Sequence, residues 1–245
     1  MAKYIANRLR VKVEFVDGVP WQERERLLYS GAVHAGWICG LPYVLKAGGG
    51  RPGIVLLAAP VMADPRYARR PVYYSDIVVR RDSTVRSFAD LRGSRWAYNE
   101  PGSHSGHNIV RYQLARLGEH AGYFGHVTAT GAHQRTLGMI AAGEVDASAI
   151  DSTVLETELR RHPELARSLR VVESWGPSPA PPWVMSRRLP AAMRRDLRCV
   201  VLSMHREPDG RALLKHACMA RFASVSDADY DPIRDMASAG GGVTL

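Results

Sequence analysis

The chain has 245 residues, of which 46% are hydrophobic and 23% are charged, and this balance is typical of a globular protein and excludes a disordered chain. Its net charge of +9 favours anionic partners, but the basic residues are scattered and form no arm or stripe, so nucleic-acid binding is not expected. No apolar run reaches the roughly 18 residues that a membrane helix needs, so the chain is not expected to span a membrane.

The start of the chain reads as a helix, because apolar residues recur at helical spacing over residues 2–9. Residues 1–10 lack the apolar core of a signal peptide.

Strands and helices are predicted to alternate from residue 11 to residue 174. The predicted strands are 11–17, 35–40, 54–62, 72–80, 95–99, 126–131, 146–151 and 169–174. The predicted helices are 21–31, 41–49 (a turn and a short helix), 87–93, 106–117, 134–143 and 152–163. This alternation predicts an α/β fold with mostly parallel sheets and flanking helices.

The segment 176–182 reads GPSPAPP and suits an extended crossover between two lobes. After it the pattern is helical to the end, and only the last residues, SAGGGVTL, suggest disorder. With 72–80 as the outward crossing, the sequence predicts two lobes with a cleft between them. Lobe 1 comprises residues 1–75 plus 178–245, and lobe 2 comprises residues 76–177.

The cysteines, Cys39, Cys199 and Cys218, form no CxxC pair and have no metal-ligand spacing. Cys199 and Cys218 could form a disulfide in an oxidising compartment, whereas the simpler interpretation is three buried thiols. The histidines show no metal-ligand pattern, and no nucleotide-binding loop is present. The sequence therefore predicts no metal and no cofactor.

The segment 99–108, NEPGSHSGHN, lies between a predicted strand and a predicted helix. Ser103 or Ser105 can cap the helix, and Gly102 and Gly106 allow close approach of the backbone. Free N–H groups at a helix start, with two serine hydroxyls beside them, are suited to bind an anion. The alternative is a capped helix with no ligand.

Four further residues are candidates for ligand contacts. His133 follows a strand at the start of the next helix and could donate to an anion, although a surface or satisfied histidine is the simpler interpretation. Asp151 ends a strand at the edge where α/β sheets bind ligands, but it could simply cap the helix that follows. Tyr43 and Tyr74 could close over a ligand or pack in the core.

Serine, histidine and aspartate are all present, so a hydrolase is a possible class. The GxSxG motif is absent, because GSHSG places serine in the second and fourth positions. An enzyme that uses His133 or His104 as acid–base and Ser105 as nucleophile or anion donor therefore stays open as an alternative.

The order of the motifs GLPYVL, YYSDIVVRRDS, SFADLRGSRWAYNEPGSHSG and GAHQRTLGMIAAGEVDASAID resembles the phosphate/phosphite/phosphonate substrate-binding proteins of ABC importers. These proteins have the type 2 periplasmic-binding-protein fold, and the resemblance covers nearly the full chain. It implies that Ser103, His104, Ser105 and His133 hold an oxyanion and that Tyr43 and Tyr74 wall the cleft. It also places Asp151 near carboxylates that contact an aminoalkyl group. His104 departs from the family, which usually has a small hydroxyl residue between the two serines.

The resemblance implies a solute-binding component of an ABC importer, without enzymatic activity, that captures phosphate, phosphite or a phosphonate between its lobes. Its partner would be the membrane permease, and its location periplasmic or exported. Because residues 1–10 show no signal peptide, a processed or truncated form and a cytoplasmic relative stay open. A ligand-sensing regulatory relative is a further alternative.

Overall fold

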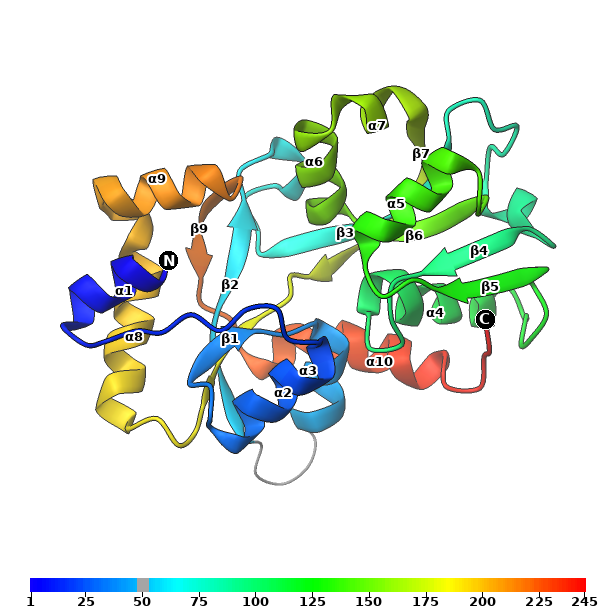
Figure 1. Cartoon of the computed structure of the whole chain (residues 1–245). Helices are drawn as coiled ribbons and strands as arrows, with labels where there is room; N and C mark the ends of the chain where they lie inside the picture. Colours follow the sequence, from blue (N-terminus) through cyan, green and yellow to red (C-terminus); the bar gives the residue numbers. More distant parts are fainter. Residues whose placement is uncertain (48–52) are drawn as a thin grey trace. The chain divides into compact units, whose positions relative to one another are not determined.

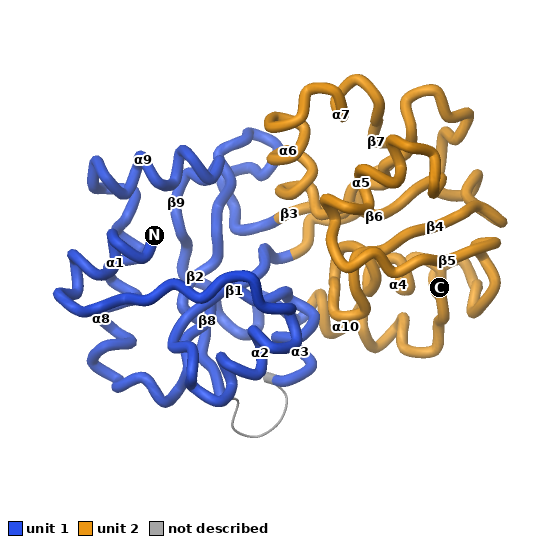
Figure 2. The backbone as a smooth tube through the Cα atoms, viewed as in Figure 1, with its two compact units in different colours: residues 1–72, 179–231 blue, residues 73–178, 232–245 orange. Residues whose placement is uncertain are grey.

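The computed structural model describes residues 1–47 and 53–245, which divide into two compact units (Figures 1 and 2). Unit 1 comprises Met1–Val72 and Pro179–Asp231, and unit 2 comprises Tyr73–Ser178 and Pro232–Leu245. Part of the helix predicted over 41–49 lies outside the described residues.

Unit 1 is built on a four-stranded sheet in its described part, with the strand order β1-β8-β2-β9. Its elements are α1 (Ala2–Leu9), α2 (Trp21–Ser30), β1 (Ala35–Trp37), α3 (Gly40–Ala47), β2 (Ile54–Met62), β8 (Trp183–Ser186), α8 (Ala191–Ser203), α9 (Pro208–His216) and β9 (Met219–Ala223). The strand β2 is paired on both sides and almost wholly buried, as expected for a strand of almost wholly apolar residues. Helix α2 ends at Gly31, whose φ of 77° suits a residue without a Cβ.

The expectation of mostly parallel sheets is wrong for unit 1. Strand β1 pairs with β8, and β2 pairs with β8 and β9, all in antiparallel fashion. Strands β8 and β9 lie in a region for which the sequence predicts only helices. Both are four or five residues long, and periodicity is weak over so short a run.

Residues 11–17 are not a strand, although they alternate like one. In the described chain this segment pairs with no strand, and Phe15 within it is 76% exposed. An alternating pattern supplies one apolar face, but a strand also needs a neighbouring strand to satisfy its backbone N–H and C=O groups.

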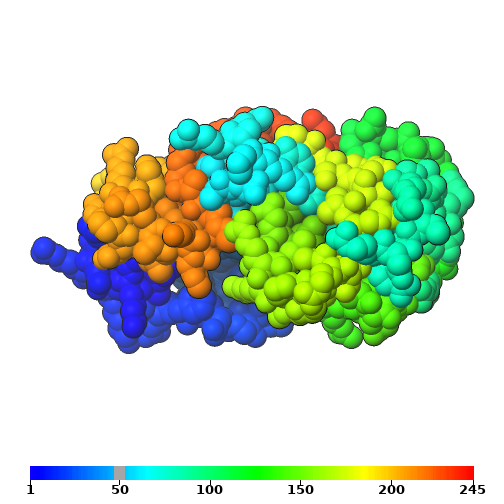
Figure 3. Space-filling view, turned by 90° about the horizontal axis from the view of Figure 1, so that it is seen from above, coloured from blue at the N-terminus to red at the C-terminus, as the bar shows by residue number. Residues whose placement is uncertain are grey.

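Unit 2 contains, in its described residues, a five-stranded sheet of the order β5-β4-β6-β3-β7. Its elements are β3 (Val72–Arg80), β4 (Arg95–Tyr98), α4 (Ile109–Arg116), β5 (His126–Ala129), α5 (His133–Ala142), β6 (Ala147–Asp151), α6 (Ser152–Arg161), α7 (Pro163–Ser168), β7 (Leu169–Pro179) and α10 (Asp231–Ala239). Strand β4 is parallel to β5 and β6, whereas β3 is antiparallel to β6. The sheet is therefore mixed, and Figure 3 shows α6 and α7 on the outer surface of the unit.

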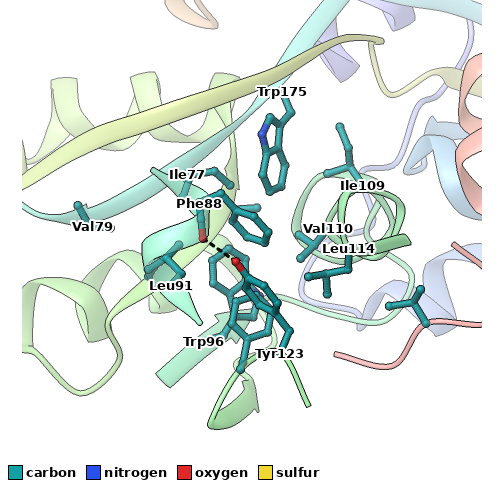
Figure 4. Packing of buried hydrophobic residues seen from close by; sticks show 14 residues of the cluster. Ile77, Val79, Phe88, Leu91, Trp96, Ile109, Val110, Leu114, Tyr123 and Trp175 are labelled. Carbon is teal, nitrogen blue, oxygen red and sulfur yellow. Dashed lines mark hydrogen bonds between the residues drawn. The ribbon is translucent and has the colours of Figure 1, made fainter. Parts of the chain in front are cut away.

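One core of unit 2 is rich in aromatic residues (Figure 4). Trp96 of β4 is fully buried and stacks on Phe124, with 4.5 Å between the ring centroids. The Tyr123 hydroxyl donates to the Phe88 carbonyl at 3.0 Å, so the one polar atom of that ring is satisfied. This packing holds β4 firmly, and the next residues of the chain carry the candidate site.

The C-terminal residues differ from both expectations for them. They belong to unit 2 instead of lobe 1, and they are ordered: Val243 is buried in the aromatic core. The Arg111 guanidinium donates to the carbonyls of Val243 (2.7 Å) and Gly241 (2.9 Å). Small residues at the end of the chain suggest disorder, but these two hydrogen bonds and one buried side chain hold them on α4.

The expectation of three buried thiols is also wrong, since Cys199 is exposed. It is a free thiol, so it forms no disulfide with Cys218. None of the helices in the described ranges has the length and apolarity required to cross a membrane.

Candidate anion site

The segment 99–108 leads from the carboxyl end of β4 into α4 through one π-helical turn, His104–Asn108. Ser103 caps this turn, because its Oγ accepts a hydrogen bond from the Gly106 N–H at 3.0 Å. The Asn108 N–H donates to the Ser103 carbonyl at 3.0 Å, five residues back, which defines the π turn. Such turns are rare and frequent at functional sites.

Three polar side chains meet at this turn. The Oγ atoms of Ser103 and Ser105 are 3.4 Å apart, and Ser105 Oγ is 3.1 Å from His133 Nε2. Each of the three residues is at least nine-tenths buried. They meet because β4 and β5 are parallel neighbours, so α4 and α5 start at the same edge of the sheet. The structure thus brings Ser103, Ser105 and His133 together, and their contact with an anion stays a prediction.

The site is polar but carries no full positive charge. Burial lowers the pKa of His133 to about 4, so its imidazole is neutral near pH 7. Among the described residues, no Lys or Arg side chain bonds to Ser103, Ser105 or His133. An anion here would be stabilised by hydroxyl and backbone N–H groups and by the helix dipole.

His104 is fully buried between two partners. Asn108 Nδ2 donates to His104 Nδ1 at 3.0 Å, so the proton of the neutral ring lies on Nε2 and is donated to Ser178 Oγ at 3.0 Å. Burial lowers the pKa of His104 to about 3, which favours this neutral form. One ring nitrogen therefore bonds within the π turn and the other ties the turn to β7, and contact between His104 and a ligand stays a prediction.

Asp151 caps α6, which is the simpler of its two expected roles. Its Oδ1 accepts from the Thr153 N–H at 2.8 Å and from the Thr153 hydroxyl at 2.7 Å. Burial raises the pKa of Asp151 to about 6. Its contact with a ligand amino group stays a prediction.

The two candidate tyrosines lie in different units. Tyr43 is in α3 of unit 1, and its hydroxyl donates to Asp227 Oδ1 at 2.6 Å. It also packs edge-on against Tyr230, with 4.9 Å between centroids. Tyr74 is in β3 of unit 2, where its N–H donates to Ser152 Oγ at 3.0 Å. Contact with a ligand stays a prediction for both.

Two residues of the site were not singled out by the sequence. Ser178 holds His104 from 74 positions away, and no local pattern signals that pair. Asn99 follows β4, is 8% exposed, and has a buried Oδ1 with no hydrogen-bond partner in the described chain. Its position directly after a buried strand could have marked Asn99 as a site residue from the sequence. The same residue ranges contain no group of three or more His, Cys, Asp or Glu side chains that could hold a metal ion.

The buried histidines predict that acid destabilises unit 2. Burial lowers the pKa of His107 to about 4, as it does for His133, and that of His104 to about 3. Below pH 6.5 the histidines of the unfolded chain bind protons, whereas the same histidines in the folded chain stay neutral until a lower pH. Each histidine then removes up to about 1.4 kcal/mol of stability per pH unit as the pH falls from 6.5 towards 4. Asp151 offsets one of the three between pH 6 and 3.8, because its raised pKa lets the folded state bind a proton first.

Urea unfolding followed between pH 7.5 and pH 4.5 tests this expectation. The variant His133→Gln should show a flatter loss of stability with acid than the wild-type chain. A steep and unchanged slope in His133→Gln would contradict the assignment.

The chain matches the family described as "ABC transporter, phosphonate, periplasmic substrate-binding protein" over residues 1–230. It is 23% identical over 171 residues to the phosphonates-binding periplasmic protein of Escherichia coli (strain K12). This match covers 68% of the chain and 51% of the relative, so the chain spans about half the length of the curated relative.

The solved structures with a similar fold include the following two. PhnD1 from Prochlorococcus marinus (MIT 9301), in complex with methylphosphonate, has a TM-score of 0.84 at 19% identity, covering 99% of this chain and 91% of that one. A binding-protein component of an ABC phosphonate transporter from Pseudomonas aeruginosa has a TM-score of 0.86 at 18% identity, covering 98% and 79%. These likenesses confirm the two-lobed α/β class, and the family match confirms the resemblance read from the motifs. The chain therefore belongs to the periplasmic substrate-binding proteins of phosphonate ABC transporters.

Proposed function

We propose that the chain binds a small phosphorus oxyanion (phosphate, phosphite or a phosphonate) at the anion site of unit 2 and releases it unchanged. The observation that carries this proposal is the buried row Ser103 Oγ, Ser105 Oγ and His133 Nε2 at the start of a helix. Neutral donors of this kind match the oxygens of an anion, and the helix N-terminus favours its charge.

Phosphorus oxyanions are the favoured class because of the relatives as well as the site. One similar structure holds methylphosphonate, and the curated relative is named for phosphonates. The family description further supports the permease of an ABC importer as the partner and the periplasm as the location.

A catalytic role for Ser105 and His133 has less support. A nucleophilic serine needs a base with a pKa near the working pH, whereas burial lowers the pKa of His133 to about 4. The base also needs an orienting partner, yet His133 Nδ1 has none among the described residues. Recovery of the bound ligand unchanged, instead of a product, is the expected result.

Titration with methylphosphonate, phosphite and phosphate tests the proposal. A ligand at about 100 times its Kd should raise the free energy of unfolding by about 2.7 kcal/mol. Ser105→Ala and His133→Ala should each weaken binding by about 10- to 100-fold, because hydrogen bonds to a charged ligand are worth about 1.5–3 kcal/mol.

The control variants carry the same kinds of change elsewhere in unit 2. Ser94 lies at the amino end of β4, away from the site, and His162 is on the surface. Ser94→Ala and His162→Gln should bind like the wild-type chain. If Ser105→Ala bound the ligand with wild-type affinity, the assignment of the site would be wrong.

A further inference from the structure

Asn99 presents a buried polar group that has no hydrogen-bond partner among the described residues. The residue is 8% exposed, and its Oδ1 is fully buried and accepts no hydrogen bond from any described residue. Its backbone, in contrast, is held firmly, because the Gly131 N–H donates to the Asn99 carbonyl at 2.7 Å. A buried amide oxygen without a donor destabilises a folded protein, so its persistence points to a donor supplied from outside the chain.

This oxygen lies at the proposed anion site. It contacts Gly106, so closely that a Cβ on Gly106 would overlap it. The same Cβ position is 3.2 Å from His133 Cε1. Asn99 follows β4 and His133 follows the parallel neighbour β5 after a short loop, so both reach the start of the π turn from the same edge of the sheet.

An acceptor here is unexpected for an anion site, because a fully ionised oxyanion has only acceptor oxygens. Ser103, Ser105 and the backbone N–H groups can donate to such oxygens, but Asn99 Oδ1 would repel them. A phosphonate, phosphite or phosphate that keeps one proton has both kinds of group: ionised oxygens and one P–OH donor. The combination of these donors with a buried acceptor on Asn99 therefore fits the protonated monoanion.

We propose that Asn99 is a specificity-determining residue, whose Oδ1 accepts the P–OH proton and selects phosphorus oxyanions that retain a proton over sulfonates and sulfate. The inference rests on the proposed function, since it concerns the ligand of the same site. A site that hydrogen-bonds a ligand OH rejects an analogue that lacks it, because its own polar group is then left unpaired.

Methylphosphonate and methanesulfonate provide the test. Below the second ionisation of methylphosphonate, both are singly charged anions of nearly the same shape, and they differ in one O–H group. The wild-type chain should bind methylphosphonate at least about 100-fold more tightly, a conservative figure for a lost OH contact of this kind. Asn99→Leu keeps the branching at Cγ and removes the whole amide, that is, the Oδ1 acceptor together with the Nδ2 donors. It should lose affinity for methylphosphonate and keep that for methanesulfonate, so that the preference falls to within about threefold.

A purely structural role for Asn99 would weaken both ligands equally, so an unchanged preference in Asn99→Leu overturns the inference. Ser94→Ala is the matched control, because Ser94 Oγ is another buried polar atom without a partner in the described residue ranges, at the opposite end of the same strand. It should keep the wild-type preference. If the wild-type chain binds neither anion, the proposed function fails. If it binds both equally while Ser105→Ala loses both, the site stands and the role of Asn99 falls.

Discussion

Replacing Gly106 with alanine is expected to abolish oxyanion binding and to lower the free energy of unfolding of unit 2 by about 1–3 kcal/mol. The added Cβ would overlap Asn99 Oδ1 and press on the His133 ring at 3.2 Å. Asn99 is buried and its backbone is held by Gly131, so its side chain has little room to move away. Isothermal titration with methylphosphonate and urea unfolding measure the two effects.

Gly138→Ala is the matched control for this substitution. Gly138 lies inside α5 of the same unit, and a Cβ there meets no atom within 4 Å. Alanine should stabilise the helix by about 0.5–1 kcal/mol and leave binding unchanged. If Gly106→Ala behaved like Gly138→Ala, the close packing of Gly106 with Asn99 and His133 would not be required for binding.

Trp96→Ala is expected to lower the free energy of unfolding by about 3–5 kcal/mol, because it removes the largest side chain that is fully buried in unit 2. The ring stacks on Phe124 and contacts Phe88 edge-on at 6.0 Å between centroids. Its loss would leave a cavity beneath β4, the strand that leads into the candidate site. Far-ultraviolet circular dichroism during urea unfolding is the suitable measurement, since removal of a tryptophan alters the fluorescence itself.

Trp37→Ala separates this burial effect from the loss of any tryptophan. Trp37 is 45% exposed in β1 of unit 1, where the Arg24 guanidinium lies 4.5 Å from its ring centroid. Its removal should lower the free energy of unfolding by about 0.5–1 kcal/mol, which is the contribution of an exposed cation–π contact. Equal losses in the two variants would show that the aromatic core of unit 2 is not tightly packed.

The sequence predicted much of unit 2 because its signals are local. Strand β4, the glycine- and serine-rich turn and the start of α4 follow one another within 15 residues, and Ser103 caps the turn as its residue type suggests. The equivalent turn before His133 follows the same strand–helix pattern. Because β4 and β5 are parallel neighbours, the two turns lie at the same edge of the sheet, and no further sequence motif is needed to bring them together.

The parts that could not be predicted depend on contacts that are distant along the chain. Strands β8 and β9 are too short to show a period, and they form because each of them pairs with one edge of β2. The ordered end of the chain depends on Arg111, more than 100 positions away. Residues 11–17 show the reverse case, since their alternation is clear but no described strand lies beside them.

Because the anion site is neutral, binding at the site should depend only weakly on ionic strength. Salt screens attraction between full charges in water, but it acts weakly on hydrogen bonds formed in a buried site. The contacts to Ser103, Ser105 and His133 should therefore hold a ligand about equally well in dilute and in saline surroundings. The net charge of +9 acts at longer range, on how fast anions arrive. Salt would thus slow capture while leaving the lifetime of the bound state nearly constant.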